Sequence, residues 1–308
     1  MNVRLPKGHS SGIPAWEASL PVLALILVLA ASCGGDGDGP LAPTIPPGFT
    51  YSLASYRQAG HITAAGAKAV MQAARPGDTE GVLKDLVAEV FRSEGCETPA
   101  FESIIAAGAN AIALHYAGSD STLQVGDLVL FDIGATSDGI CSDCSRTFPA
   151  GTAFDPRQRE LYQLVLDVHR QVVGFARPGL DSLITLNRRA REMFATSPLR
   201  ARDENGDLRP MDTFFVHSIG HYVGKRVHGE DTGWSALEPL EAGQVLAIEP
   251  GLYIATEGIG IRIEDTYLVT DTGLECLTCG CPKEPEEIEA LRQILPSAVS
   301  ALEEPNLP

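Results

Sequence analysis

Five stretches of the chain place apolar residues at the three- and four-residue spacing of an amphipathic helix. The first ends at Pro76-Gly77-Asp78, which breaks a helix, and Thr79 with Glu80 opens the second. Arg177-Pro178-Gly179 separates the third from the fourth. The predicted helices cover residues 51 to about 75, 79 to about 90, 156–176, 181–196, and a C-terminal stretch that begins near Pro285.

Other stretches are short and continuously apolar, which is typical of buried strands. The predicted strands cover residues 128–131 and 140–148, a strand with turns at 103–116, and several strands within 214–269. Because the order is helices, strands, helices, strands, the pattern predicts an α+β fold built in layers. We expect one folded domain, residues 51–295, followed by a tail, residues 296–308.

The first fifty residues follow a different pattern. Arg4 and Lys7 precede an apolar run at residues 20–31, which is shorter than the roughly 20 residues needed to span a bilayer. Small residues and Cys33 follow, and the arrangement resembles a bacterial lipoprotein signal, in which the cysteine is lipidated. We therefore expect a signal peptide at residues 1–32 and a flexible tether with lipidated Cys33 at residues 33–50.

The lipoprotein interpretation predicts an exported bacterial protein at the periplasmic or outer face of a membrane, held there by its lipid anchor only. Two alternatives remain open at this point. One is an ordinary secretory signal that is cleaved nearby, and the other is an uncleaved anchor.

Composition narrows the classes of function. Of the 308 residues, 44% are apolar and 20% charged, which is enough for a buried core. The formal net charge of −17 argues against a nucleic-acid-binding protein, which needs a basic face. Carboxylates are ligands of hard cations, so the same acidity leaves metal binding open.

If Cys33 is lipidated, an even number of cysteines remains, which permits disulfides in an exported protein. Cys141/Cys144 and Cys276/Cys279 have the spacing of zinc or iron–sulfur sites, but on a strand the first two would point to opposite faces. Disulfides between the 141–144 and 276–281 segments, buried thiols and a metal site all remain open.

Five ionisable residues lie in or beside strands that otherwise resemble core, namely Asp132, Asp143, His221, Glu249 and Glu264. Each alone could be a turn, cap or satisfied core residue. A carboxylate that ends a buried strand nevertheless costs free energy unless it is paired or coordinates a cation. Convergence on one dinuclear metal site explains all five, and carboxylates with one imidazole suit Mn²⁺, Co²⁺, Fe²⁺ or Zn²⁺.

These residues lie in motifs that resemble the metallopeptidase family of Xaa-Pro aminopeptidases, prolidases and methionine aminopeptidases. The resemblance extends from about residue 55 to residue 293. The motifs are Leu130-Phe131-Asp132-Ile133-Gly134, Gly139 to Ser142 followed by Asp143, Arg146-Thr147-Phe148-Pro149, Gly220-His221-Tyr222-Val223-Gly224, Ile248-Glu249-Pro250-Gly251-Leu252-Tyr253 and Ile261-Arg262-Ile263-Glu264-Asp265. The resemblance implies the pita-bread fold, with antiparallel sheets covered by helices, and two divalent metal ions bound by the five ionisable residues, Mn²⁺ being the first choice.

The resemblance also implies roles around the metals. His115, in Leu114-His115-Tyr116, would contact the substrate, and His228 would stabilise the tetrahedral intermediate. The expected substrate pocket is lined by His115, His217, Tyr253 and Arg262. We assign the proton shuttle to Glu249, because a metal-bound carboxylate lies within reach of the attacking water.

Residues 277–289 are similar to the closing segment of Xaa-Pro aminopeptidases, so we expect an enzyme that cleaves the N-terminal bond of peptides, of Xaa-Pro type. An Xaa-Pro dipeptidase, a broader aminopeptidase, and a non-catalytic or metal-free creatinase-like protein are the alternatives. The catalytic domain is expected directly after the tether, without the N-terminal domain that proline enzymes usually carry. Substrate length and oligomeric state therefore stay open.

Overall fold

The computed structural model of the chain describes residues 51–293. The expected signal peptide, the tether with Cys33 and the expected tail at residues 296–308 lie outside the described residues. Within them, no helix combines the length and apolar character needed to cross a membrane.

The predicted helices are confirmed, with small shifts at their ends. Side chains of Ser52, Thr79, Asp155 and Ser182 accept hydrogen bonds from the first turns of α1 to α4, so polar caps decide where each helix begins. The helices are α1 (Leu53–Ala73), α2 (Glu80–Ser93), α3 (Pro156–Phe175), α4 (Leu183–Thr196) and α5 (Pro285–Gln293).

The strands form small antiparallel sheets. One sheet has the order β1-β2-β5, a second has the order β12-β11-β8, and β9 pairs with β10. Their bounds are β1 (Ile104–Ala107), β2 (Leu128–Ile133), β5 (Cys144–Pro149), β8 (Val245–Ile248), β9 (Gly251–Ile254), β10 (Ile259–Arg262), β11 (Asp265–Val269) and β12 (Leu274–Cys276). Two further pairs join β3 (Thr136–Ser137) to β4 (Ile140–Cys141) and β6 (Arg200–Arg202) to β7 (Leu208–Pro210).

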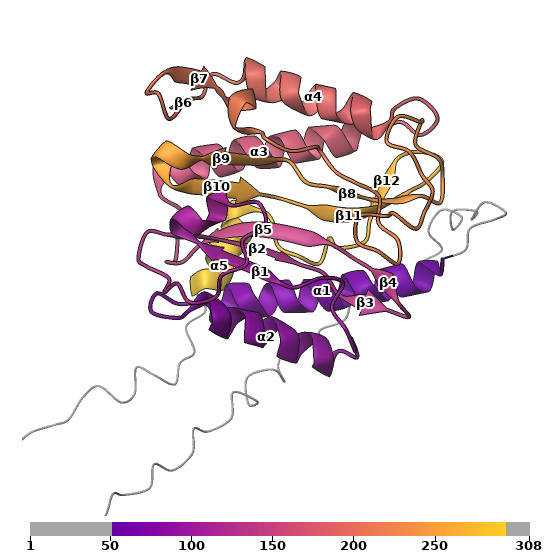
Figure 1. Cartoon of the computed structure of the whole chain (residues 1–308), viewed down its shortest axis with the longest axis horizontal. Coiled ribbons are helices and arrows are strands. Elements are labelled where there is room, and N and C mark those ends of the chain that lie inside the picture. The colour runs from indigo at the N-terminus through magenta and orange to yellow at the C-terminus, as the bar shows by residue number, and fades with distance from the viewer. Residues whose placement is uncertain (1–50, 294–308) are drawn as a thin grey trace, which may run out of the picture. The chain divides into compact units, whose positions relative to one another are not determined.

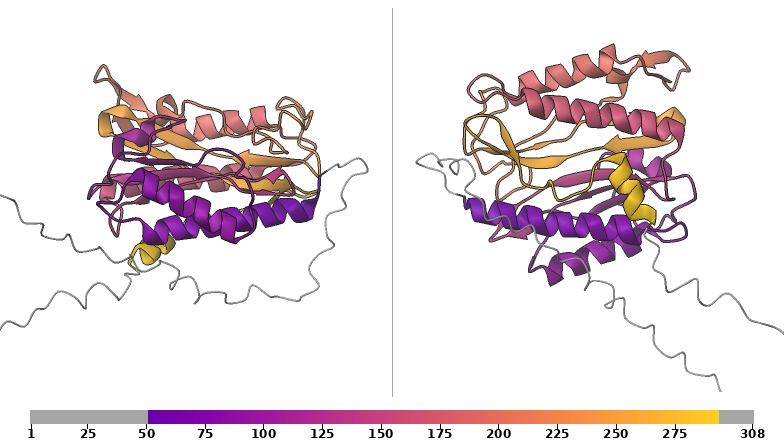
Figure 2. Two further views of the ribbon diagram at one scale, coloured as in Figure 1. Left: turned by 60° about the horizontal axis from the view of Figure 1, so that its bottom comes forward. Right: turned by 180° about the vertical axis from the view of Figure 1, so that it is seen from behind.

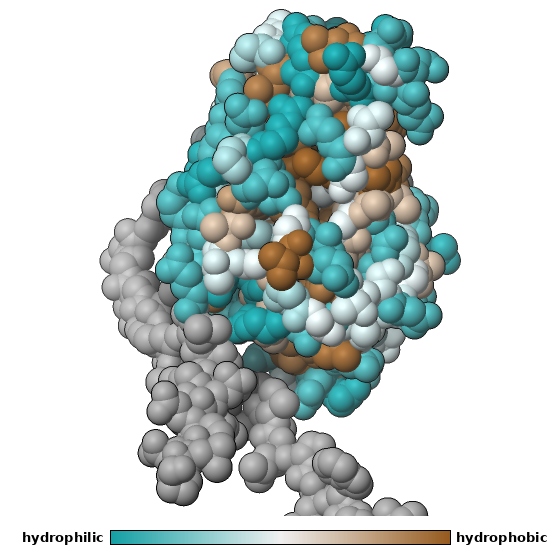
Figure 3. Space-filling model, turned by 90° about the vertical axis from the view of Figure 1, so that its left-hand side faces the viewer, coloured by the Kyte–Doolittle hydropathy of each residue, from teal (hydrophilic) through white to brown (hydrophobic). Residues whose placement is uncertain are grey.

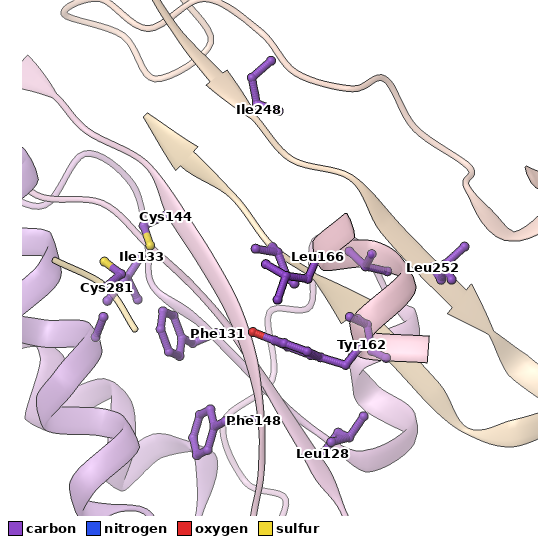
Figure 4. Close-up of a cluster of buried hydrophobic side chains, with 14 of the residues drawn as sticks. Leu128, Phe131, Ile133, Cys144, Phe148, Tyr162, Leu166, Ile248, Leu252 and Cys281 are labelled. Carbon is purple, nitrogen blue, oxygen red and sulfur yellow. The ribbon is translucent and has the colours of Figure 1, made fainter. Parts of the chain in front are cut away.

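Helices cover the sheets in layers. Helices α1 and α2 pack together along the β1-β2-β5 sheet, whereas α3 packs against α4 and against β9 and β10 (Figures 1 and 2). Side chains from β2, β5, α3 and β9 meet in one hydrophobic core, which includes Phe131, Phe148, Tyr162 and Leu166 (Figure 4). On the face shown in Figure 3, hydrophilic residues predominate and the hydrophobic ones form separate small patches. The α+β expectation is confirmed.

Several predicted elements differ from the structure. The strand expected over residues 140–148 is split into β4 and β5, and the stretch 103–116 contains only β1 and a 3-10 helix, η2 (Gly108–Ile112). Strands were expected throughout 214–269, but residues 215–244 form none that pairs as a regular ladder. The backbone N–H and C=O groups of this region instead form hydrogen bonds within turns, with side chains such as that of Asp231, and with the backbone of β8. The β6–β7 hairpin was not expected.

The cysteines agree with one of the alternatives considered and depart from the others. A disulfide joins Cys276 to Cys279, two residues that follow one another closely in sequence. Among the described residues, the remaining cysteines are buried free thiols: Cys96, Cys141, Cys144 and Cys281. The expected bridges between the 141–144 and 276–281 segments are therefore absent, and buried thiols are correct for Cys141 and Cys144.

Candidate metal centre

The five predicted metal ligands meet in one place, and the four carboxylates among them lie at the ends of different strands or directly beside them. Asp132 is the fifth residue of β2, and Asp143 lies in the break between β4 and β5. Glu249 directly follows β8, and Glu264 lies in the short link between β10 and β11. Since β2 pairs with β5 and β8 pairs with β11, the two sheets bring the four carboxylates together in two pairs.

His221 is brought to the carboxylates by a segment that runs along β8. The backbone N–H groups of Val223, Ala247 and Glu249 donate to carbonyls across the gap between this segment and β8. Gly220 makes this close approach possible, because a Cβ atom at that position would lie 1.9 Å from the carbonyl oxygen of Ala247. The backbone contact therefore determines where the imidazole points.

The imidazole faces three of the carboxylates. His221 Nε2 lies 3.5 Å from Asp143 Oδ2, 3.8 Å from Glu264 Oε1 and 3.9 Å from Glu249 Oε1. Its Nδ1 is 2.9 Å from the carbonyl oxygen of Tyr222, which can only accept, so Nδ1 carries the proton and Nε2 presents a lone pair. One ligand atom each from Asp143, His221 and Glu264 lies within 4.8 Å of the other two.

Unpaired oxygens show that the cluster suits cations. Oδ1 of Asp132 and Oδ1 of Asp143 are buried and accept no hydrogen bond from any residue in the range 51–293. Burial, together with the neighbouring charges of Asp132 and Glu249, raises the pKa of Asp143 well above its usual range. Burial and the charge of Asp143 do the same to the pKa of Glu264. Divalent cations would give these oxygens a partner and neutralise the negative charge, so the donor set fits the metal ions that the resemblance implies.

Two hydroxyl groups orient the ligands, and the sequence did not single them out. Ser145 Oγ donates to Glu264 Oε2 at 2.7 Å. The backbone N–H of Asp143 donates to Thr266 Oγ1 at 2.9 Å, and this hydroxyl donates back to the carbonyl oxygen of Asp143 at 2.8 Å. Both residues are buried in strands, but a hydroxyl residue in a strand is too common for the sequence alone to reveal its role.

Arg262 connects the metal ligands to the expected substrate side. Its Nη2 donates to Asp132 Oδ2 at 2.7 Å, and its Nη1 donates to the Tyr253 hydroxyl at 2.9 Å. The Tyr253 hydroxyl lies 3.0 Å from His217 Nε2, and His217 Nδ1 lies 2.7 Å from the Ser218 carbonyl oxygen. Burial lowers the pKa of His217 to about 4, so this ring is neutral at neutral pH and accepts from Tyr253.

His115 and His228 lie at the more open side of the cluster. The rings of His228 and His221 are perpendicular, with their centroids 4.8 Å apart. Partial burial of its ring and the neighbouring His221 lower the pKa of His228. His115 is exposed, and it lies near enough to His217 and His228 for its charge to act on the pKa of both. The structure thus gathers every predicted site residue except Cys33, which lies outside the described range.

Comparison with known proteins identifies the family. Residues 54–271 match the sequence profile of metallopeptidase family M24. The chain belongs to this family. The resemblance read from the motifs is therefore confirmed, and the family's pita-bread fold agrees with the small antiparallel sheets and covering helices.

Individual M24 relatives agree with this. The chain is 35% identical over 254 residues to the Xaa-Pro aminopeptidase of Escherichia coli, covering 78% of this chain and 57% of that protein. It is 36% identical over 219 residues to the Xaa-Pro dipeptidase of Pyrococcus furiosus, covering 68% of this chain and 58% of that protein. The chain thus spans less than two thirds of the length of these relatives.

Solved structures show the same relationship. Proline aminopeptidase P II from Yersinia pestis has a TM-score of 0.71 at 35% identity, covering 79% of this chain and 60% of that one. Aminopeptidase P from Escherichia coli with the inhibitor Pro-Leu has a TM-score of 0.69 at 34% identity, covering 78% of this chain and 58% of that one. At 34–35% sequence identity, the chain resembles these two structures in sequence as well as in fold.

Proposed function

We propose that the protein is a dinuclear metallo-aminopeptidase that hydrolyses the N-terminal peptide bond of peptides with proline in the second position. The observation that carries this proposal is the convergence of Asp132, Asp143, His221, Glu249 and Glu264, where Asp132 and Asp143 each have a buried oxygen that accepts no hydrogen bond from residues 51–293. The Xaa-Pro aminopeptidases among the relatives support the substrate class.

These five residues would hold two divalent cations, Mn²⁺ being the first choice, with Co²⁺, Zn²⁺ or Fe²⁺ as alternatives. When bound, the cations would supply a water of lowered pKa and a Lewis acid for the scissile carbonyl. His228 would donate a hydrogen bond to the carbonyl oxygen as negative charge develops there. Glu249 would take up the proton of the attacking water and pass it to the leaving nitrogen.

The residues around the cluster would bind the peptide. His115 stands on the open side, and His217 lies deeper, where its ring contacts the Tyr253 hydroxyl that Arg262 also binds. The carboxylates attract the free α-amine of the substrate, whose positive charge is complementary to theirs. An Xaa-Pro dipeptidase remains the second candidate, because the Pyrococcus furiosus relative bears that name.

A panel of peptides would test the activity. Xaa-Pro, Xaa-Pro-Yaa and Met-Ala-Yaa peptides are incubated with the chain in Mn²⁺, Co²⁺, Zn²⁺ or Fe²⁺, and release of the first residue is measured. We expect cleavage of Xaa-Pro-Yaa. Cleavage of Xaa-Pro alone would favour the dipeptidase, cleavage of Met-Ala-Yaa a broader aminopeptidase, and no turnover with any metal would contradict the proposal.

We also propose that lipidated Cys33 anchors the enzyme to a bacterial membrane, with the tether at residues 33–50 separating it from the surface. The support is the apolar run at residues 20–31 followed by small residues and Cys33. In a bacterial host, the unchanged protein should incorporate labelled palmitate and sediment with membranes, and Cys33→Ser should do neither. Labelling that persists in Cys33→Ser would contradict the anchor.

A further inference from the structure

Glu80, the first residue of α2, is a buried acid that lies apart from the metal ligands. Its side chain is fully buried, and no basic side chain of residues 51–293 forms an ion pair with it. Oε1 accepts from the backbone N–H of Ala107 at 2.8 Å and from Asn110 Nδ2 at 2.9 Å. Oε2 accepts from the Tyr116 hydroxyl at 2.9 Å. A buried carboxylate needs such donors, and its place at a helix N-terminus adds a favourable dipole.

The three donors all belong to one segment. Residues 107–116 contain the end of β1, the 3-10 helix η2 and the loop with His115. The Glu80 carboxylate therefore accepts hydrogen bonds from the start, the middle and the end of this segment. Removal of the carboxylate would leave the backbone N–H of Ala107 and the Tyr116 hydroxyl without this acceptor, while the Asn110 amide would keep its bonds to the Tyr116 hydroxyl and to Ser121 Oγ.

The opposite side of the same segment lies against the substrate wall. A Cβ atom on Gly260 in β10 would lie 2.1 Å from the carbonyl oxygen of Ala111, so η2 rests directly on that strand. Ala111 and Tyr253 belong to one hydrophobic cluster, with Leu114 and Tyr116 packed against it. The segment is thus fixed between Glu80 and the strands that carry Tyr253 and Arg262.

His115 depends on this attachment. Its side chain is exposed and makes no hydrogen bond to another described residue, so the backbone of this segment is what places its Cβ and limits the positions its ring can reach. The neighbouring Tyr116 is one of the three residues that donate to Glu80. We propose that Glu80 is a positioning residue, whose carboxylate fixes residues 107–116 and thereby holds His115 toward the substrate. This inference rests on the proposed function, because His115 is assigned to the substrate there.

The test uses the metal-loaded full chain and an Xaa-Pro-Yaa peptide. Glu80→Ala should lower kcat/KM roughly tenfold or more, as expected when a substrate contact moves by about 1 Å. Glu80→Gln should recover most of the loss, because its amide oxygen can still accept from Ala107 and Asn110. Should Glu80→Ala fail to fold, Tyr116→Phe removes one of the three bonds and should give a smaller loss of the same kind.

A double-mutant cycle separates positioning from general destabilisation. In a His115→Ala background, Glu80→Ala should change kcat/KM by less than about twofold, since both changes remove the same contact. Thr79→Ala is the matched control: its hydroxyl caps the same helix but binds only Val82 N–H, so it should lower Tm while kcat/KM stays within about twofold. Bound metal should stay the same in all variants.

Hydrogen exchange provides a readout that does not need activity. The amides of residues 113–117 should exchange faster in Glu80→Ala than in Thr79→Ala. The proposal is overturned if Glu80→Ala keeps full activity, or if it causes the same loss with and without His115. If the unchanged chain hydrolyses no peptide, the proposed function fails instead, and the exchange rates of residues 113–117 then decide the positioning role alone.

Discussion

Arg262 is the cation that lets four carboxylates share a buried site. Its guanidinium bonds directly to Asp132, and its Nε donates to Ser145 Oγ at 2.7 Å, which in turn donates to Glu264. One side chain therefore orients two of the predicted metal ligands, one of them through a hydroxyl group. Such hydrogen bonds behind the ligands determine metal affinity as well as ligand orientation.

Ser145→Ala should reveal this indirect contact. The substitution removes the hydroxyl between Arg262 and Glu264 and leaves both charged groups in place. We expect metal binding about 10- to 100-fold weaker, measured by titration calorimetry, with little change in Tm of the metal-free protein. Ser137→Ala, on β3 away from the ligands, is the control, and equal affinities of the two variants would contradict the role.

Removal of a ligand itself should have a larger effect. Asp143→Ala and His221→Ala each delete a donor from the group whose atoms lie within 4.8 Å of one another. Both should lose metal uptake and peptide hydrolysis while their circular dichroism spectra match that of the unchanged protein. Unchanged activity in either purified variant would disprove the ligand assignment.

At the scale of elements, the segment from Ile219 to Val223 acts as an irregular partner of β8. It bonds to β8 through backbone groups, although only Tyr222 and Leu246 form a regular bridge. The imidazole of His221 is thereby placed next to Glu249, the residue that ends β8. The close backbone approach at Gly220 is the geometric condition for the site.

Gly220→Ala tests that condition. Its Cβ would collide with backbone, which cannot rotate away, so the segment must shift from β8. We expect the free energy of unfolding to fall by about 1–3 kcal/mol in denaturant titrations, together with weaker metal binding. Gly174→Ala is the matched control, since its Cβ meets nothing within 4 Å in helix α3, and it should raise stability by roughly 0.5–1 kcal/mol. Similar effects of both substitutions would rule out the steric argument.

Elements that depend on local signals are predictable from the sequence, and those that depend on distant partners are not. The helix cap Thr79 and the apolar run in β2 identify their elements correctly. Residues 215–244 are apolar enough to suggest strands, yet their hydrogen-bond partners lie elsewhere in the fold, so no ladder forms.

The same distinction holds for the site. The five ligands are conspicuous because ionisable residues are unusual in apolar strands. A hydroxyl residue in a strand and a glutamate at the start of a helix are common, so the sequence does not single out Ser145, Thr266 or Glu80. Their roles become visible only from contacts in the fold: Ser145 Oγ lies 2.7 Å from Glu264 Oε2, Thr266 Oγ1 lies 2.9 Å from the Asp143 nitrogen, and Glu80 Oε1 lies 2.8 Å from the Ala107 nitrogen.

At the scale of the whole molecule, a buried ion pair joins distant parts of the chain behind the metal site. Arg146 Nη2 bonds to Asp265 Oδ1 at 2.6 Å, and Arg146 also donates to the carbonyl oxygens of Cys281 and Pro282. Lys283 Nζ reaches Asp265 Oδ2 at 2.7 Å. Although burial alone would raise it, the two cations hold the pKa of Asp265 below its usual value. The C-terminal segment is thereby fixed to the strand that follows Glu264.

His169, on α3, faces this ion pair from the helical layer. It is buried, its Nε2 lies 3.7 Å from Asp265 Oδ2, and its Nδ1 has no hydrogen-bond partner among the described residues. Burial lowers the pKa of His169 to about 3, and the charges of Lys283 and Arg146 add to this shift. The folded protein therefore keeps this ring neutral under conditions in which an exposed histidine is protonated.

This buried ring makes a destabilising contribution at acid pH. Below about pH 6.5 the unfolded chain binds a proton at His169 that the folded chain does not, so the contribution of His169 to the free energy of unfolding falls as the pH drops from about 6.5 toward 3. The contribution of one such group approaches about 1.4 kcal/mol per pH unit. His169→Gln stays neutral, so it should remove this slope from the plot of the free energy of unfolding against pH. The free energies are measured by urea titrations of metal-free protein between pH 7 and pH 4.5. His61→Gln, an exposed position on α1, is the control, and parallel curves for His169→Gln and the unchanged protein would contradict the assignment.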